Sequence, residues 1–259
     1  VTLESLNDNT GTIALLSSGG IDGGSGTVLM RAANYAFGGA DRTITTTGVL
    51  TIEPDADENS FASSFDNQYL NPVSVTGLTL GKSSNASAIT LSRAISLSGP
   101  VSIYGGSIDV NANITANSGN ILLDADTGST LNQSSTGILL DDVITIETVT
   151  SGNLTLIGRS GDTGSGFDGI DASSANTTTL RSAGNLTLQG YSYAASGSGR
   201  GVDLNNDVIA ASGTVSMSGQ HNTGATYAIS LSGSTSITAG TGVTLESLND
   251  NTGTIALLS

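Results

Sequence analysis

The residues best suited to chemistry lie in one acidic stretch, EPDADENSFASSFDNQYLNP, at positions 53–72. Its oxygen-bearing side chains recur at alternate positions, a spacing that lets one loop wrap a hard cation, as in helix-loop-helix calcium sites. The expected ligands are Asp55, Asp57, Asn59, Phe61 and Asp66. Ser60 replaces the usual glycine, Asp66 replaces the usual bidentate Glu and no flanking helices are expected, so a solvated acidic loop is favoured over bound calcium. No cofactor is required, and calcium is the one candidate ion.

A second acidic loop, GRSGDTGSGFDGID, contains Asp162, Asp168 and Asp171. It lacks the repeated nonapeptide of calcium-dependent β-rolls. A simple acidic loop is therefore favoured over a second calcium site.

Aromatic residues gather in two places. Phe61, Phe65 and Tyr69 lie in the 53–72 stretch, and Tyr191 and Tyr193 form a pair further on. Such rings either cover a small local core or provide a lateral contact, with a neighbouring rod or with a glycan that stacks on them.

Enzymatic catalysis is not expected. Carboxylates must be clustered with a base or a cation to act in a cleft. The chain has one His, His221, in a polar turn where we expect it to be exposed, and one Lys, Lys82. The sequence therefore predicts no catalytic residues.

Composition limits the partners. Twenty-two acidic residues against seven basic ones give a net charge of −15, which repels nucleic acid and anionic lipid. No apolar run approaches the roughly 20 residues of a membrane helix. We expect neither nucleic-acid binding nor a membrane span within this segment.

The chain repeats itself. Residues 1–17, VTLESLNDNTGTIALLS, recur without a substitution at 243–259, an offset of 242 residues. Chance does not produce such identity, so we interpret residues 1–242 as one full period of a tandem array and 243–259 as the start of the next. On this interpretation the partners are identical repeats stacked end to end.

A shorter phrase, a glycine followed by alternating apolar residues, recurs within the period. It begins at Gly11, Gly26, Gly48, Gly77, Gly99, Gly119, Gly152, Gly184, Gly213 and Gly242. The mean spacing of about 24 residues lies in the range of solenoid repeats. With the β-branched composition, about three short strands per repeat predict an all-β parallel β-helix (β-solenoid) of about ten coils per period.

Asn follows three of these glycines, at Asn120, Asn153 and Asn185. Stacked Asn side chains can hydrogen-bond along the axis as a ladder. Alternatively, each Asn simply tolerates a turn conformation.

The Gly-Asn phrases, the Ser/Thr/Asn/Gly bias and the large identical repeats resemble the filamentous-haemagglutinin-like and other giant β-strand-repeat surface proteins of bacteria. The resemblance implies a right-handed parallel β-helix at the bacterial cell surface. The expected function is a structural module of an extracellular fibre, stalk or adhesin, whose rods could also contact neighbouring fibres or surface glycans. The alternative is a glycan- or calcium-binding surface module that acts through the 53–72 insertion.

Overall fold

Short parallel strands make up the regular structure. The structure is a computed structural model that describes residues 1–5, 10–16, 20–39, 41–55, 58–125, 135–140, 142–173, 176–221, 224–248 and 253–258. The described residues contain twenty-nine strands and no helix. The predicted all-β class is therefore confirmed.

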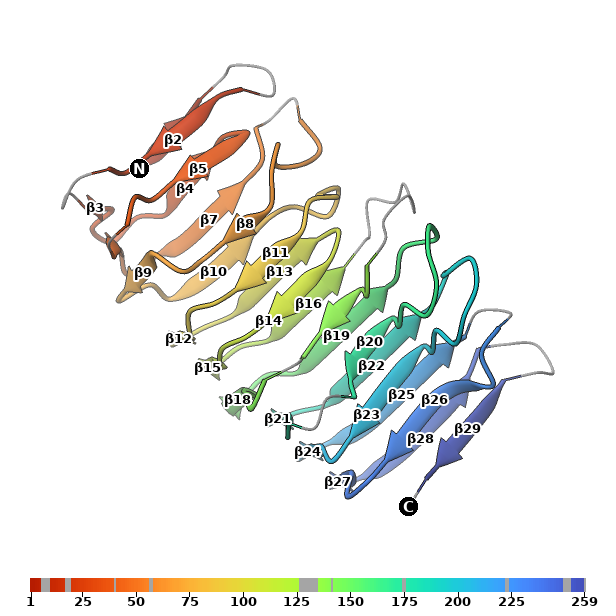
Figure 1. The fold of residues 1–259 in the computed structure, drawn as a ribbon. Helices are drawn as coiled ribbons and strands as arrows, with labels where there is room; N and C mark the ends of the chain where they lie inside the picture. The colour runs from red at the N-terminus through yellow and green to blue at the C-terminus, as the bar shows by residue number, and fades with distance from the viewer. Residues whose placement is uncertain are drawn as a thin grey trace.

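The strands stack into three faces (Figure 1). The first sheet has ten strands and runs the length of the stack. It comprises β1 (Thr2–Glu4), β4 (Val28–Arg31), β7 (Val49–Glu53), β10 (Gly77–Leu80), β13 (Val101–Gly105), β16 (Ile121–Ala125), β19 (Leu154–Arg159), β22 (Leu186–Tyr191), β25 (Thr214–Gln220) and β28 (Gly242–Ser247).

The second sheet, of eight strands, forms another face. It comprises β8 (Phe65–Asp66), β11 (Ile89–Leu91), β14 (Ile108–Val110), β17 (Ile138–Leu139), β20 (Ile170–Ala172), β23 (Val202–Asn205), β26 (Tyr227–Ser232) and β29 (Thr254–Leu257). A separate two-stranded sheet near the N-terminus consists of β2 (Thr12–Ala14) and β5 (Asn34–Ala36).

The third sheet has six strands. It comprises β12 (Ile95–Leu97), β15 (Ile114–Ser118), β18 (Thr145–Ser151), β21 (Thr179–Ser182), β24 (Val208–Ala211) and β27 (Ser236–Ala239). A three-stranded sheet near the N-terminus consists of β3 (Ile21–Asp22), β6 (Arg42–Thr45) and β9 (Leu70–Val73). Within every sheet, neighbouring strands are three places apart in the chain, so the chain winds as a β-solenoid.

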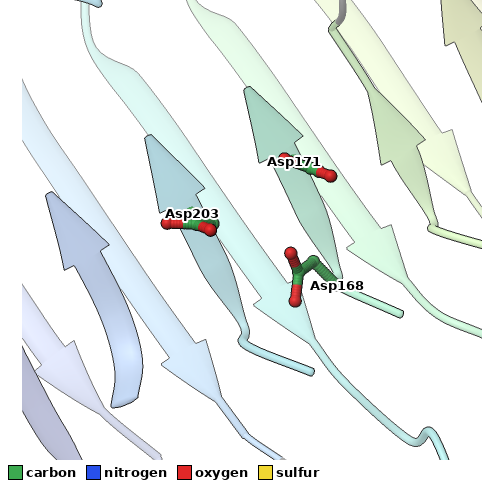
Figure 2. Close-up of side chains that lie close together, drawn as sticks. All are labelled: Asp168, Asp171 and Asp203. Carbon is green, nitrogen blue, oxygen red and sulfur yellow. The ribbon is translucent and has the colours of Figure 1, made fainter. Parts of the chain in front are cut away.

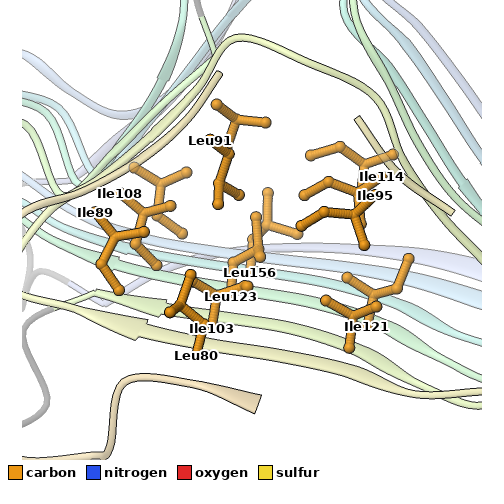
Figure 3. Close-up of a cluster of buried hydrophobic side chains, with 14 of the residues drawn as sticks. Leu80, Ile89, Leu91, Ile95, Ile103, Ile108, Ile114, Ile121, Leu123 and Leu156 are labelled. Atoms are coloured by element: carbon orange, nitrogen blue, oxygen red, sulfur yellow. The ribbon is translucent and has the colours of Figure 1, made fainter. Parts of the chain in front are cut away.

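Alternation along each strand builds the core. Apolar residues at every second position face inward, and register between coils places like residues above one another. One such column contains Leu80, Ile103, Leu123, Leu156, Leu188 and Met217, all fully buried. Figure 3 shows part of this core, in which aliphatic side chains from all three faces meet. The interior is thus one continuous hydrophobic core along the stack.

The two copies of the repeated segment form equivalent strands at opposite ends of the stack (Figure 1). Within the copies, β1 corresponds to β28 and β2 to β29. The phrase at Gly11 forms β2, which lies outside the first sheet, whereas the other nine phrases lead into first-sheet strands. The period therefore spans nine coils of about 27 residues, rather than ten of about 24, and nine strand spacings make about 43 Å.

Candidate functional site

The predicted calcium loop is divided among different structural roles. Phe61 is buried in the core, Asn59 is exposed, and Asp66 ends β8 with Oδ1 accepting the N–H of Gln68 at 2.9 Å. Asp55 is buried at 2% exposure. Asp57 lies outside the described residues.

An ammonium group is bound at this loop. Lys82 Nζ donates to the backbone carbonyl of Asp55 at 3.0 Å and to that of Glu58. The chain's own lysine therefore uses two of the loop's carbonyl oxygens. Calcium binding here stays a prediction.

The aromatic residues of the insertion form a small core. The rings of Phe61 and Phe65 lie 5.5 Å apart and pack against Tyr35 and Phe37, with centroid distances of 5.6–5.9 Å. This cluster lies where β5 and β8 are not paired, so it fills the break in the second face. At 4% and 5% exposure, Phe61 and Phe65 are not accessible platforms, and that part of the lateral-contact hypothesis is wrong. Tyr69 is half-buried against the main core.

The second aromatic pair remains at the surface. Tyr191 and Tyr193 are half-buried, and their rings are nearly parallel, with centroids 6.3 Å apart and an interplanar angle of 4°. The Arg159 guanidinium lies 5.5 Å from the Tyr191 ring centroid and donates to Asp124 at 2.9 Å. A lateral or glycan contact through this pair stays a prediction.

The three Asn residues of the predicted ladder hydrogen-bond along the axis, but their side-chain oxygens accept backbone N–H groups of the next coil. Asn120 Oδ1 accepts the N–H of Asn153, and Asn153 Oδ1 accepts the N–H of Asn185, both at 2.9 Å. Asn185 Oδ1 in turn accepts the N–H of Thr214 at 2.9 Å. Four successive coils are therefore joined along one edge by side-chain amides.

The glycine before each Asn makes room for this ladder. Gly152 has φ +111°, in the region that favours glycine, and a Cβ there would lie 1.9 Å from the Gly119 carbonyl oxygen. At Gly184 a Cβ would lie 2.5 Å from Asn153 Oδ1. The Gly-Asn phrase thus marks a tightly stacked corner of the solenoid, the turn at which the chain enters a strand of the first sheet.

The densest group of chemistry-bearing side chains is an acidic cluster on the second sheet. Asp168, Asp171 and Asp203 each offer a carboxylate oxygen, and these oxygens lie within 4.8 Å of one another (Figure 2). Asp171 is in β20 and Asp203 is its in-register partner in β23, while Asp168 comes from the loop before β20. We call this group the Asp cluster.

Each carboxylate of the Asp cluster is held by one oxygen. Asp168 Oδ1 accepts the backbone N–H of Arg200, and Asp203 Oδ2 accepts the Arg200 guanidinium. Asp171 Oδ1 accepts the N–H of Ser173 at 2.8 Å. The guanidinium also lies 6.0 Å from the ring centroid of Tyr227. These contacts fix the three groups in place, and among the described residues Asp203 Oδ1 has no hydrogen-bond partner.

Burial makes the Asp cluster electrostatically costly. Asp168 is 8% exposed and Asp203 is 3% exposed. The pKa of Asp168 is raised to about 7, chiefly by burial and also by the charges of Asp171 and Asp203, while the N–H of Arg200 opposes the rise. Burial also raises the pKa of Asp203, although Arg200 opposes this. Such a group favours binding of a proton or a cation.

Sequence reasoning identified two members of the Asp cluster and missed the third. Asp203 lies in another phrase, VDLNND, and the β20–β23 register aligns it with Asp171. Matching the phrases coil by coil could have found it. Asp162 is not in the Asp cluster. The expectation that His221 is exposed is wrong: it is buried, with 7% exposure.

No protein-family model, curated protein or solved structure matches the chain. Nor do the described residues include a helix suited to crossing a membrane. The functional argument therefore rests on the fold and on the sites above.

Proposed function

We propose that residues 1–242 are one period of a tandem β-solenoid that serves as a structural module of an extracellular bacterial fibre, stalk or adhesin. Residues 243–259 begin the next period. On this proposal the module extends and stiffens a rod, its partners are identical repeats above and below, and it performs no catalysis.

The pairing of the repeated strand carries the proposal. In the first copy, β1 pairs along one edge with β4, through Leu3 and Met30. In the second copy, β28 pairs along the opposite edge with β25, through Leu245 and Met217. Because the copies are identical in sequence, one strand of this type can pair on both edges at once. That is the condition for an uninterrupted stack.

The contacts of the first copy indicate what the second would gain. Glu4 accepts from Arg31 at 3.0 Å, and Arg31 also binds Glu53 at 2.5 Å, which gives a charge column along the axis. Glu246, the copy of Glu4, is exposed at the end of the stack. A following period would bring the copy of Arg31 to it.

Apolar exposure at the ends supports the same conclusion. Val243 is 49% exposed and Leu257 is 73% exposed, whereas equivalent positions within the stack are buried. Another coil would cover these side chains. Each Å² of apolar surface that it removes from water stabilises the stack by about 25 cal/mol.

The extracellular role is tested by immunogold electron microscopy with antibodies raised against residues 1–242. We expect gold along thin filaments outside intact cells that produce the protein. Label confined to the interior of permeabilised cells would contradict the proposal.

A further inference from the structure

We infer that the Asp cluster is a calcium site, in which Asp168, Asp171 and Asp203 bind one Ca²⁺ on the outer side of the second sheet. This inference does not depend on the fibre role. It follows from two buried oxygen atoms, from the spacing of the carboxylates and from the local charge.

Two buried oxygens at the Asp cluster lack a hydrogen-bond partner among the described residues. They are Asp203 Oδ1 and the hydroxyl oxygen of Ser230. Ser230 is 1% exposed and pairs in register with Asp203. It alternates with the core residues Ile229 and Leu231, so its side chain faces the same side as the Asp cluster.

An unpartnered buried oxygen is destabilising, and more so when the group is charged. The Ser230 hydroxyl is near enough to the Asp203 carboxylate to lower the pKa of Asp203 by hydrogen bonding. The positions of the two side chains nevertheless fall short of hydrogen-bond geometry, and on that stricter measure both oxygens lack a partner among the described residues. A cation beside Asp203 would satisfy the carboxylate oxygen and give the hydroxyl oxygen a charge to face. Both orphaned atoms thereby point to the same ligand.

The spacing favours calcium over magnesium. Two oxygens bound to one Ca²⁺ at about 2.3–2.6 Å can be up to about 5 Å apart, whereas the limit for Mg²⁺, at about 2.0–2.1 Å, is near 4.2 Å. The carboxylate oxygens of the Asp cluster lie within 4.8 Å of one another. Separations up to this bound fit Ca²⁺, the larger ion with the more flexible coordination, with less side-chain movement than Mg²⁺ would need.

The charge also matches a divalent ion. Three carboxylates and the guanidinium of Arg200, bound to Asp203, leave two negative charges when all are ionised. Burial in a medium of low dielectric makes that excess costly unless it is neutralised. One Ca²⁺ neutralises it.

The test is a calorimetric titration of CaCl₂ into the metal-free 259-residue chain at pH 7.5, paired with thermal unfolding. We expect one calcium ion per chain and a Tm that rises with calcium concentration. The dissociation constant should be about 10⁻⁴–10⁻³ M, the range of weak calcium sites in extracellular protein modules. MgCl₂ should bind at least tenfold more weakly. Circular dichroism without calcium checks that each variant folds.

Matched variants locate the ion. Asp203→Asn and, at a half-exposed position, Asp171→Asn should each weaken binding at least tenfold. Asp66→Asn, in the 53–72 stretch, should leave binding unchanged. The inference is overturned if the wild-type chain binds no calcium, or if both cluster variants bind like wild type. Loss of binding in Asp66→Asn alone would place the ion in the 53–72 loop instead.

Discussion

Truncation of one buried leucine tests the inward columns against a neighbour in the same strand. Leu123 and Leu122 are adjacent in β16; Leu123 is fully buried, whereas Leu122 faces outward and is partly exposed. Leu123 lies in register between Ile103 and Leu156. Because hydrogen bonds hold these coils at the strand spacing, the neighbours cannot collapse into the space left by Leu123→Ala.

Buried Leu→Ala changes destabilise by about 2–5 kcal/mol, more where the cavity persists, so we expect about 3–4 kcal/mol for Leu123→Ala. Leu122 lies between Ser102 and Thr155 on the outer surface. Leu122→Ala should therefore lower the free energy of unfolding by less than about 1 kcal/mol. Urea unfolding followed by circular dichroism measures both, with the wild-type m value as the check on cooperativity. Equal losses for the two variants would refute the facing of the first sheet.

Three further outcomes follow from the corner ladder and the buried carboxylates. Asn153→Ala removes the acceptor of the Asn185 N–H and should lower the free energy of unfolding in urea by about 1 kcal/mol. Asn153→Asp keeps an accepting oxygen and should restore most of that stability. Equal stabilities for the two variants would exclude the ladder. Gly152→Ala should cost about 2 kcal/mol or more, since its φ of +111° disfavours a side chain, and a neutral result would contradict the tight corner. The pKa of Asp168 is raised from 3.8 to about 7, so the folded state binds the proton of this carboxyl group more tightly than the unfolded state does. With EDTA present to remove metal ions, the stability of the fold should therefore fall as the pH rises from about 4 to about 7. That loss is up to about 4 kcal/mol, and Asp168→Asn should remove it; an unchanged slope in the variant would contradict the assignment.

The first sheet could be predicted from the sequence because its signal is local. A glycine, then apolar residues at alternate positions, specifies both a turn and a facing, and nine of the ten phrases lead into first-sheet strands. The phrase at Gly11 has the same letters but forms β2 outside that sheet, because a strand's face depends on how many residues precede it in the coil. Spacing alone therefore gave one coil too many.

The Asp cluster and the aromatic core could not be predicted in full because they depend on stacking. Asp171 and Asp203 are 32 positions apart, and only the coil register makes them neighbours. Likewise, Tyr35 meets Phe61 and Phe65 because the second face is interrupted between β5 and β8. The burial of Phe61 could not be predicted from the spacing at 53–72 for the same reason, because its ring packs against Tyr35 of another coil and against Phe65.

The most direct test of the central claim is small-angle X-ray scattering of chains with one, two and three copies of residues 1–242, each followed by 243–259. Nine coils per period at about 4.8 Å predict that the maximum dimension grows by about 43 Å per copy while the cross-sectional radius stays constant. A constant cross-section with that increment means one continuous solenoid. Separate beads on flexible connections, or growth in the cross-section, would contradict it.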